Sequence, residues 1–121
     1  MKFTREAPTA VTIRSLDRGT IKVGETVYSE TVAVSADGIV REWHAKPIDE
    51  LSGEDFLGLF DAGPEVIILG TGQQHLMPPR DLVFAMARSG IGFEVMHTAA
   101  AARTFNVLVG EGRLVAAVLY I

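Results

Sequence analysis

Two short runs of almost wholly apolar residues constrain this chain more than any other feature. Residues 66–69 read VIIL and residues 114–121 read LVAAVLYI. A strand with one wet face alternates apolar and polar residues, so an unbroken apolar run is typical of a central strand covered on both faces. Both runs are far shorter than the roughly 20 apolar residues of a membrane-spanning helix. The sequence therefore predicts a buried sheet and no membrane span.

Helical patterns separate these runs and indicate crossover connections. We expect strands over 65–69, 91–96 and 113–120, and helices over 79–89 and 99–109. Strand–helix–strand alternation is typical of parallel strands. Pro79 suits a first helical turn and Gly90 suits the residue after a helix. Residues 106–113 could instead form a hairpin, because Val and Phe favour strands.

The first half of the chain has a different, β-rich pattern. We expect strands over 10–16, 20–23, 26–34 and 39–44, followed by a short helix over 53–60 that Ser52 caps. Asp37-Gly38 is a hairpin signal, because Gly takes a positive φ at no cost. A chain of 121 residues fits one domain over 1–121, with 1–9 as a loose N-terminal segment. The predicted fold class is α/β, with a β-rich N-terminal half and a β-α-β-α-β C-terminal half.

Composition excludes several classes of function. The net charge of −4 without a basic run disfavours nucleic-acid binding. The absence of cysteine excludes disulfides, a thiol nucleophile and iron–sulfur clusters. The three histidines lack metal-ligand spacing, so we predict no metal site and no cofactor. The N-terminal residues have no apolar core typical of a secretory signal, and we expect a cytoplasmic protein.

A glycine loop follows the first apolar run. Gly70-Thr71-Gly72 resembles the start of a dinucleotide fingerprint, but the sixth position of that pattern is His75 rather than glycine. Pro78 and Pro79 have no N–H to offer a phosphate, so a nucleotide cradle of the usual kind is disfavoured. The loop is then either a tight corner or part of a site for another anionic ligand.

If the loop is only a tight turn, it gives no reason for the presence of Arg80 just after it. A helical projection from residue 79 places Arg80 inside an apolar arc, at a helix N-terminus where a cation opposes the helix dipole. Either a bound anion or an internal ion pair would offset this charge. The candidate partners for an ion pair are Glu65, Glu94 and Glu111.

A second polar cluster lies in residues 97–106. Arg103 and Asn106 are one helical turn apart among small residues, where they could jointly hold a planar polar group. Alternatively, Arg103 solvates an outer face and Asn106 caps a helix end. Thr98 is expected to cap this helix, and His97 is either an acid–base group or an ordinary surface residue.

The C-terminal half resembles a known family of uncharacterised domains. The motifs that carry the resemblance are PEVIILGTG at 64–72, GIGFEVMHT at 90–98, AARTFNVL at 101–108 and EGRLVAA at 111–117. This family includes NADH dehydrogenase (complex I) assembly factor 3 and the adipogenesis-associated domain protein. The resemblance implies a three-layer β/β/α arrangement with a mixed sheet. It implies an association with assembly of a respiratory complex for the mitochondrial members, and it transfers no particular enzyme activity to this chain.

These observations lead to three hypotheses of function. The first is a non-enzymatic, assembly-factor-like protein that binds a protein partner. The second is a domain that binds a small molecule or anion, either as a binding module or as an enzyme. Its site would comprise Gly70, Thr71, Gly72, Arg80, Thr98, Arg103 and Asn106. The third is a domain that mainly self-associates.

Overall fold

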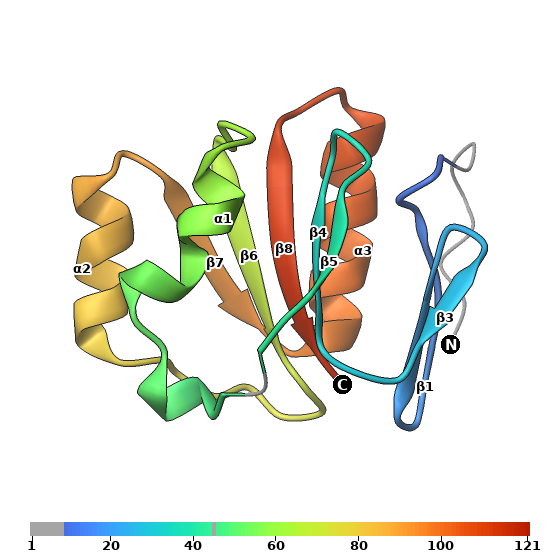
Figure 1. Cartoon of the computed structure of the whole chain (residues 1–121), viewed down its shortest axis with the longest axis horizontal. Coiled ribbons are helices and arrows are strands. Elements are labelled where there is room, and N and C mark those ends of the chain that lie inside the picture. The colour runs from blue at the N-terminus through green and yellow to red at the C-terminus, as the bar shows by residue number, and fades with distance from the viewer. Residues whose placement is uncertain (1–8, 45) are drawn as a thin grey trace.

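The computed structural model describes residues 9–44 and 46–121. Two sheets and a few helices make up the fold (Figure 1). The small sheet contains β1 (Ile13–Asp17), β2 (Thr20–Val23) and β3 (Thr26–Tyr28). The central sheet contains β4 (Val32–Ser35), β5 (Val40–Glu42), β6 (Val66–Thr71), β7 (Gly92–Met96) and β8 (Val115–Tyr120). The helices are α1 (Leu57–Phe60), α2 (Arg80–Arg88) and α3 (Thr98–Gly110), with 3-10 turns η1 (Ile48–Glu50) and η2 (Gly53–Phe56). The predicted loose segment lies, except for Thr9, outside the described residues.

The central sheet is mixed, as the family resemblance implied. Its strand order is β5-β4-β8-β6-β7. β6 runs parallel to both β7 and β8, whereas β4 is antiparallel to β8 and β5. The crossovers from β6 to β7 and from β7 to β8 contain α2 and α3, so the predicted alternation in the C-terminal half is confirmed.

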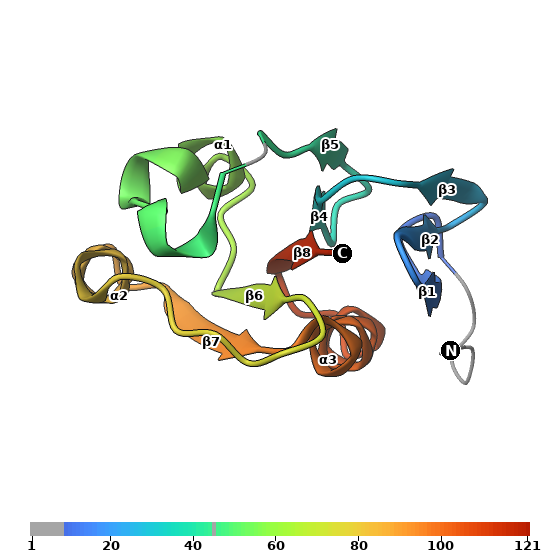
Figure 2. The same cartoon turned by 90° about the horizontal axis from the view of Figure 1, so that it is seen from below.

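The fold has three layers with the central sheet in the middle (Figure 2). One face packs against α1, α2 and the 3-10 turns, and the other packs against α3 and the small sheet. Alternate residues of β6 supply the two cores: Ile67 and Leu69 face α2, while Ile68 faces α3. Every residue of β6 is buried. Burial on both faces is the reason that the strand reads as an unbroken apolar run.

Several expectations about local structure were wrong. Segment 26–34 is not one strand, because β3 belongs to the small sheet and β4 to the central sheet. All residues of β4 are buried between the outer layers, whereas Thr26 and Val27 of β3 are exposed. The short helix expected over 53–60 is confirmed in its bounds and in its Ser52 cap, but its first turn, Gly53–Phe56, is 3-10 and only Leu57–Phe60 is α-helical. The hairpin alternative for 106–113 is also wrong, because α3 continues to Gly110 and packs Leu108 on the core.

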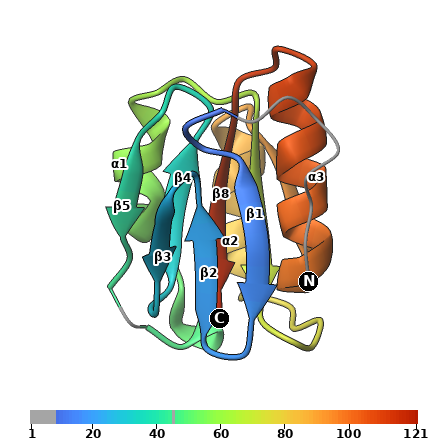
Figure 3. The same ribbon diagram turned by 90° about the vertical axis from the view of Figure 1, so that its right-hand side faces the viewer.

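Asn106 fastens the small sheet to α3. Its side-chain oxygen accepts the N–H of Ile13, and its amide nitrogen donates to the carbonyl of Ile13, both at 2.9 Å. The side chain is buried, and within the described part of the chain it takes the place of a neighbouring strand on this edge of β1 (Figure 3). The side chain of Asn106, which the sequence placed with Arg103 as a holder of a planar polar group, is thus bonded to the backbone N–H and C=O of Ile13.

We predict that Asn106→Ala lowers the free energy of unfolding by about 2–4 kcal/mol, because it removes the side-chain partner of both the N–H and the C=O of Ile13. Chemical denaturation monitored by circular dichroism measures the change. Val107→Ala is the matched control, since Val107 is the next residue of α3 and is exposed. The control should alter stability by no more than about 0.5 kcal/mol. Equal losses in the two variants would contradict the role assigned to Asn106.

Candidate ligand-binding pocket

The glycine loop is held at the carboxyl end of β6 by backbone hydrogen bonds to Thr98. The N–H of Gly72 donates to Thr98 Oγ1 at 2.7 Å, and the N–H of Thr98 donates to the Gly72 carbonyl at 2.8 Å. Gly72 has φ of 91°, a left-handed conformation that side chains disfavour. The loop thus turns where a glycine is needed and docks directly on the start of α3.

Thr98 does not cap α3, contrary to expectation. It is the first residue of the helix and is 1% exposed, and its hydroxyl donates to the carbonyl of Tyr120 at the end of β8. The N-cap is His97, whose Nδ1 accepts the N–H of Ala100 at 3.3 Å. Because Nδ1 accepts this hydrogen bond, the neutral ring carries its proton on Nε2.

Thr71 fixes the rest of the loop. It is buried, and its hydroxyl bonds to the carbonyl of Gln74 while accepting the N–H of Leu76 at 3.2 Å. A threonine hydroxyl has one proton and two lone pairs, and these internal contacts use the proton and one lone pair. The hydroxyls of Thr71 and Thr98 are therefore both engaged in shaping the loop.

Gly70 allows α3 to approach the sheet. A Cβ atom at this position would lie 3.0 Å from Thr98 Oγ1 and 3.1 Å from both Ala101 Cβ and Leu119 Cδ2. Small residues at 70 and 101 thus bring helix and strand into close contact. Packing is therefore a sufficient reason for a glycine at this position.

A pocket of about 540 Å³ opens beside this junction. Its walls come from four segments that are distant in sequence: the β1–β2 turn, the glycine loop, the start of α3 and the end of β8. The lining residues are Leu16, Asp17, Arg18, Gly19, Gly72, Gln73, His97, Thr98, Ala99, Tyr120 and Ile121. The carboxyl edge of a parallel sheet is where ligands of α/β proteins usually bind. We call this cavity the edge pocket.

The predicted site residues do not converge on the edge pocket as a set. Gly72 and Thr98 line it, Gly70 and Thr71 lie behind it, and Asn106 is bound to β1. Arg80 and Arg103 are exposed on α2 and α3, which cover opposite faces of the central sheet (Figure 2). The composite site that joined the two arginines is therefore not assembled.

The expectation that Arg80 lies within the apolar arc of its helix was wrong. α2 begins at Arg80 rather than at residue 79, and its buried face is centred on Leu82 and Met86. Glu65, one of the proposed partners, lies 3.8 Å from Arg113 instead. The arginine side chain is in solvent, where its charge needs no internal partner.

Sequence reasoning missed the polar residues of the β1–β2 turn. Asp17 and Arg18 line the edge pocket next to His97, and they supply most of its charge. Their place at a turn was visible in the sequence, but the packing of the small sheet beside β8 was not. Within the described part of the chain, no group of three or more His, Cys, Asp or Glu residues could hold a metal ion.

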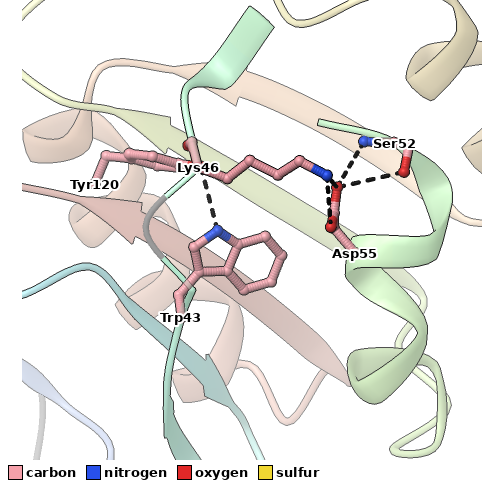
Figure 4. A network of polar contacts seen from close by, with 5 residues as sticks. All are labelled: Trp43, Lys46, Ser52, Asp55 and Tyr120. Carbon is pink, nitrogen blue, oxygen red and sulfur yellow. Dashed lines mark hydrogen bonds and ion pairs between the residues drawn. The ribbon is translucent and has the colours of Figure 1, made fainter. Parts of the chain in front are cut away.

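A polar network lies on the other side of β8 and fixes the segment that leads into η2 (Figure 4). Trp43 Nε1 donates to the Tyr120 hydroxyl at 3.2 Å, and that hydroxyl donates to the Lys46 carbonyl at 2.8 Å. Lys46 Nζ lies 3.1 Å from Asp55, which also accepts the N–H of Ser52. Tyr120 thus connects this network to the edge pocket, which it also lines.

Two pKa values report the environment of this network. Burial raises the pKa of the Tyr120 hydroxyl, with a further increase from the Asp55 charge, although the hydrogen bond from Trp43 acts against both. Burial also pushes the pKa of Asp55 upward, but the Ser52 N–H and the Lys46 ammonium outweigh it and hold that pKa below its ordinary value. At neutral pH the network therefore joins a neutral phenol to a charged ion pair.

We predict that Gly70→Ala destabilises the protein by about 1–3 kcal/mol, because the added methyl group overpacks the contact between α3 and the sheet. Gly92→Ala is the matched control on a neighbouring strand, since a Cβ there meets its nearest atom at 3.4 Å. Thermal denaturation of both variants measures the difference. A Gly70→Ala protein as stable as the control would show that α3 does not need this close approach.

Comparisons with known proteins identify the family. Residues 13–120 match a family described as a protein of unknown function (DUF498/DUF598). A relative from Francisella tularensis, named 13 kDa major membrane protein, is 31% identical over 102 residues, which are 82% of this chain and 80% of that protein. NADH dehydrogenase [ubiquinone] 1 alpha subcomplex assembly factor 3 of Bos taurus is 30% identical over 118 residues. That alignment covers 95% of this chain but only 63% of the bovine protein.

Solved structures show the same fold. An NMR structure from Xanthomonas campestris has a TM-score of 0.82 at 34% identity and covers 100% of this chain and 92% of that one. A Bordetella pertussis protein described as a Mth938-like domain has a TM-score of 0.79 at 27% identity, covering 99% and 92%. The match spans nearly the whole fold, including the strands and helix that form the edge pocket. This chain is therefore a member of the DUF498/DUF598 family of proteins of unknown function.

Proposed function

We propose that this protein binds another protein and acts, like its assembly-factor relatives, as a non-enzymatic factor in the building of a larger complex. The name of the bovine relative supports an assembly role, although this chain spans less than two thirds of that protein. The proposal includes a cytoplasmic location, which the cysteine-free sequence fits. None of the described helices is long and apolar enough to cross a membrane.

The observation that carries the proposal is a set of exposed apolar side chains in segment 76–84. Leu76, Met77 and Phe84 are 47%, 62% and 51% exposed. Phe84 lies on α2, which stands at one end of the molecule (Figure 1), and Leu76 and Met77 lie in the loop before this helix. Phe and Met are enriched in protein interfaces, where burial of such side chains provides much of the affinity.

The experiment that tests this proposal is affinity purification from an extract of the native cells, followed by identification and titration of the partner. We expect a stable stoichiometric partner whose affinity falls at least about tenfold in Met77→Ser and Phe84→Ser, because interface anchors of this kind contribute more than about 1 kcal/mol each. Val107→Ser, an exposed apolar residue on α3, should bind normally. Repeated recovery of the bare domain would refute the proposal.

The edge pocket favours a second candidate function, the binding of a small anionic molecule. Its volume suits a metabolite-sized ligand, and Arg18, Gln73 and His97 are lining residues whose side chains carry N–H donors. This version of the site retains Gly72 and Thr98 from the sequence-based set. It replaces Arg80 and Arg103 with residues that line the cavity.

A thermal-shift screen against nucleotides, phosphates and carboxylate metabolites tests this second function. A ligand at about 100 times its Kd should raise Tm by at least about 5 °C. Arg18→Ala should abolish the shift, whereas Arg80→Ala should not, because Arg80 does not line the pocket. A shift that depends on Arg80 instead, or no shift with any compound, would count against the edge pocket as the binding site.

A further inference from the structure

β7 has an open edge that sets it apart from the other strands of the central sheet. It lies at the end of the strand order and pairs, among the described residues, only with β6. It is five residues long, whereas β5 at the opposite edge has three. In the small sheet, Asn106 occupies the outer side of β1 at Ile13, and β3 has only three residues. β7 and β1 are thus the longest edge strands, with five residues each, and among the described residues β7 is the one whose outer side carries no bond from α3.

The hydrogen-bonding groups on this side can be assigned from the ladder. The N–H of Gly92 donates to the Glu65 carbonyl at 2.9 Å, so Gly92 faces β6. In a parallel ladder alternate residues bond the same neighbour, so Glu94 also faces β6, whereas Phe93 and Val95 direct their N–H and C=O groups outward. The N–H of Ile91, which shares their direction, donates to the Met86 carbonyl of α2 at 3.2 Å. The open side of β7 thus begins where this contact with α2 ends.

The side chains around this edge match an added strand. Phe93 and Val95 are half-buried and pack on the core beneath α2, so they would form the wall for apolar residues of a partner. Glu94 lies between them and is exposed on the opposite face of the sheet. The edge also adjoins the exposed apolar segment 76–84, because α2 packs against β7 and the loop before it passes below the end of β7 (Figures 1 and 2).

Glu94 decides which kind of strand fits. Consider a second copy of this chain whose β7 pairs antiparallel with this one through both outward residues. Phe93 of each copy would then lie opposite Val95 of the other, and the two Glu94 side chains would face each other. That position is a non-hydrogen-bonded pair, where side chains approach most closely. Like charges directly opposite each other are destabilising. A cationic side chain at that position would be stabilised instead, and the net charge of −4 on this chain also favours a basic partner. The edge is therefore suited to a different protein.

We propose that β7 is a docking edge for an antiparallel β-strand of a partner protein, with apolar residues opposite Phe93 and Val95 and a Lys or Arg opposite Glu94. Main-chain hydrogen bonds to the two outward residues would provide affinity, and the pair at Glu94 would provide register and specificity. This inference rests on the proposed protein-binding function and names the surface and the chemistry of its partner.

NMR with isotope-labelled protein and a synthetic peptide tests the inference. The peptide has about nine residues of alternating Thr and Val with one central Lys, and a second peptide carries Glu in place of Lys; this alternation matches the two faces of a strand. We expect the Lys peptide to shift the amide signals of Phe93 and Val95 and to bind about tenfold more tightly than the Glu peptide. Glu94→Lys should reverse this preference. Glu111→Lys, the same charge change at an exposed site after α3, should preserve it.

Val95→Pro provides a second and independent variant. It removes an outward N–H without removing a bond to β6, and proline is tolerated on such edges. Peptide binding should weaken by more than about fivefold, which corresponds to loss of one hydrogen bond of about 1 kcal/mol. Peptide signals that map elsewhere, or an unchanged preference in Glu94→Lys, would overturn the inference. A concentration-dependent dimer that Val95→Pro dissolves would overturn it in favour of self-association.

The inference and the proposed function can fail separately. Suppose that the native partner binds to wild-type protein, is lost in Phe84→Ser and is retained in Val95→Pro and Glu94→Lys. Protein binding would then stand, and strand addition at β7 would be wrong. The converse outcome is that no native partner is found but the Lys peptide binds at β7 with the expected charge dependence. In that case β7 can accept an added strand, and the proposed assembly role lacks support.

Discussion

The close contact between α3 and the central sheet is the constraint on which the rest of this structure depends. Thr98 is buried at its centre, where its hydroxyl joins the Gly72 N–H to the Tyr120 carbonyl. A single side chain thereby connects the ends of β6 and β8 to the first turn of the helix. Gly70 and Ala101 keep the helix near enough for these bonds to form. The edge pocket exists because the strands end together at this junction.

The residue types that suggested a functional site are explained largely by this contact. Glycines, threonines and an asparagine near strand ends are typical of ligand loops, but here they satisfy buried backbone groups. Asn106 binds a peptide of β1, and Thr71 binds the loop that follows it. Charged residues that do face the edge pocket come from the small sheet instead. The same polar residue types make the hydrogen bonds that stabilise a fold and those that bind a ligand. Only the three-dimensional contacts show which of the two roles a given side chain has.

Sequence reasoning predicted the buried, parallel part of the fold well, because two-sided burial leaves a strong pattern. The apolar runs placed β6 and β8, and Pro79 and Gly90 bracketed α2 closely. It did not separate β3 from β4, since a chain that leaves one sheet for another can stay extended and keep its alternation. It placed Arg80 within the apolar arc because Phe84 and Ala87 flank it in the projection, but both of these residues are exposed in the structure and only Leu82 and Met86 are buried. The edge pocket could not be predicted, because it depends on how two sheets pack.

The position of β8 has a consequence for how this fold is made. It lies between β4 and β6 in the sheet, yet it follows every other strand in the sequence. During synthesis, the small sheet and the β4–β5 hairpin can form from local contacts, but the two parts of the central sheet share no hydrogen-bonded ladder until residues 115–120 have emerged from the ribosome. Until then β4 and β6 expose apolar edges that pair with β8 in the finished protein. Completion of the central sheet is thus a late, all-or-none event. Until it occurs, the nascent chain is exposed to chaperones and to mispairing with other strands.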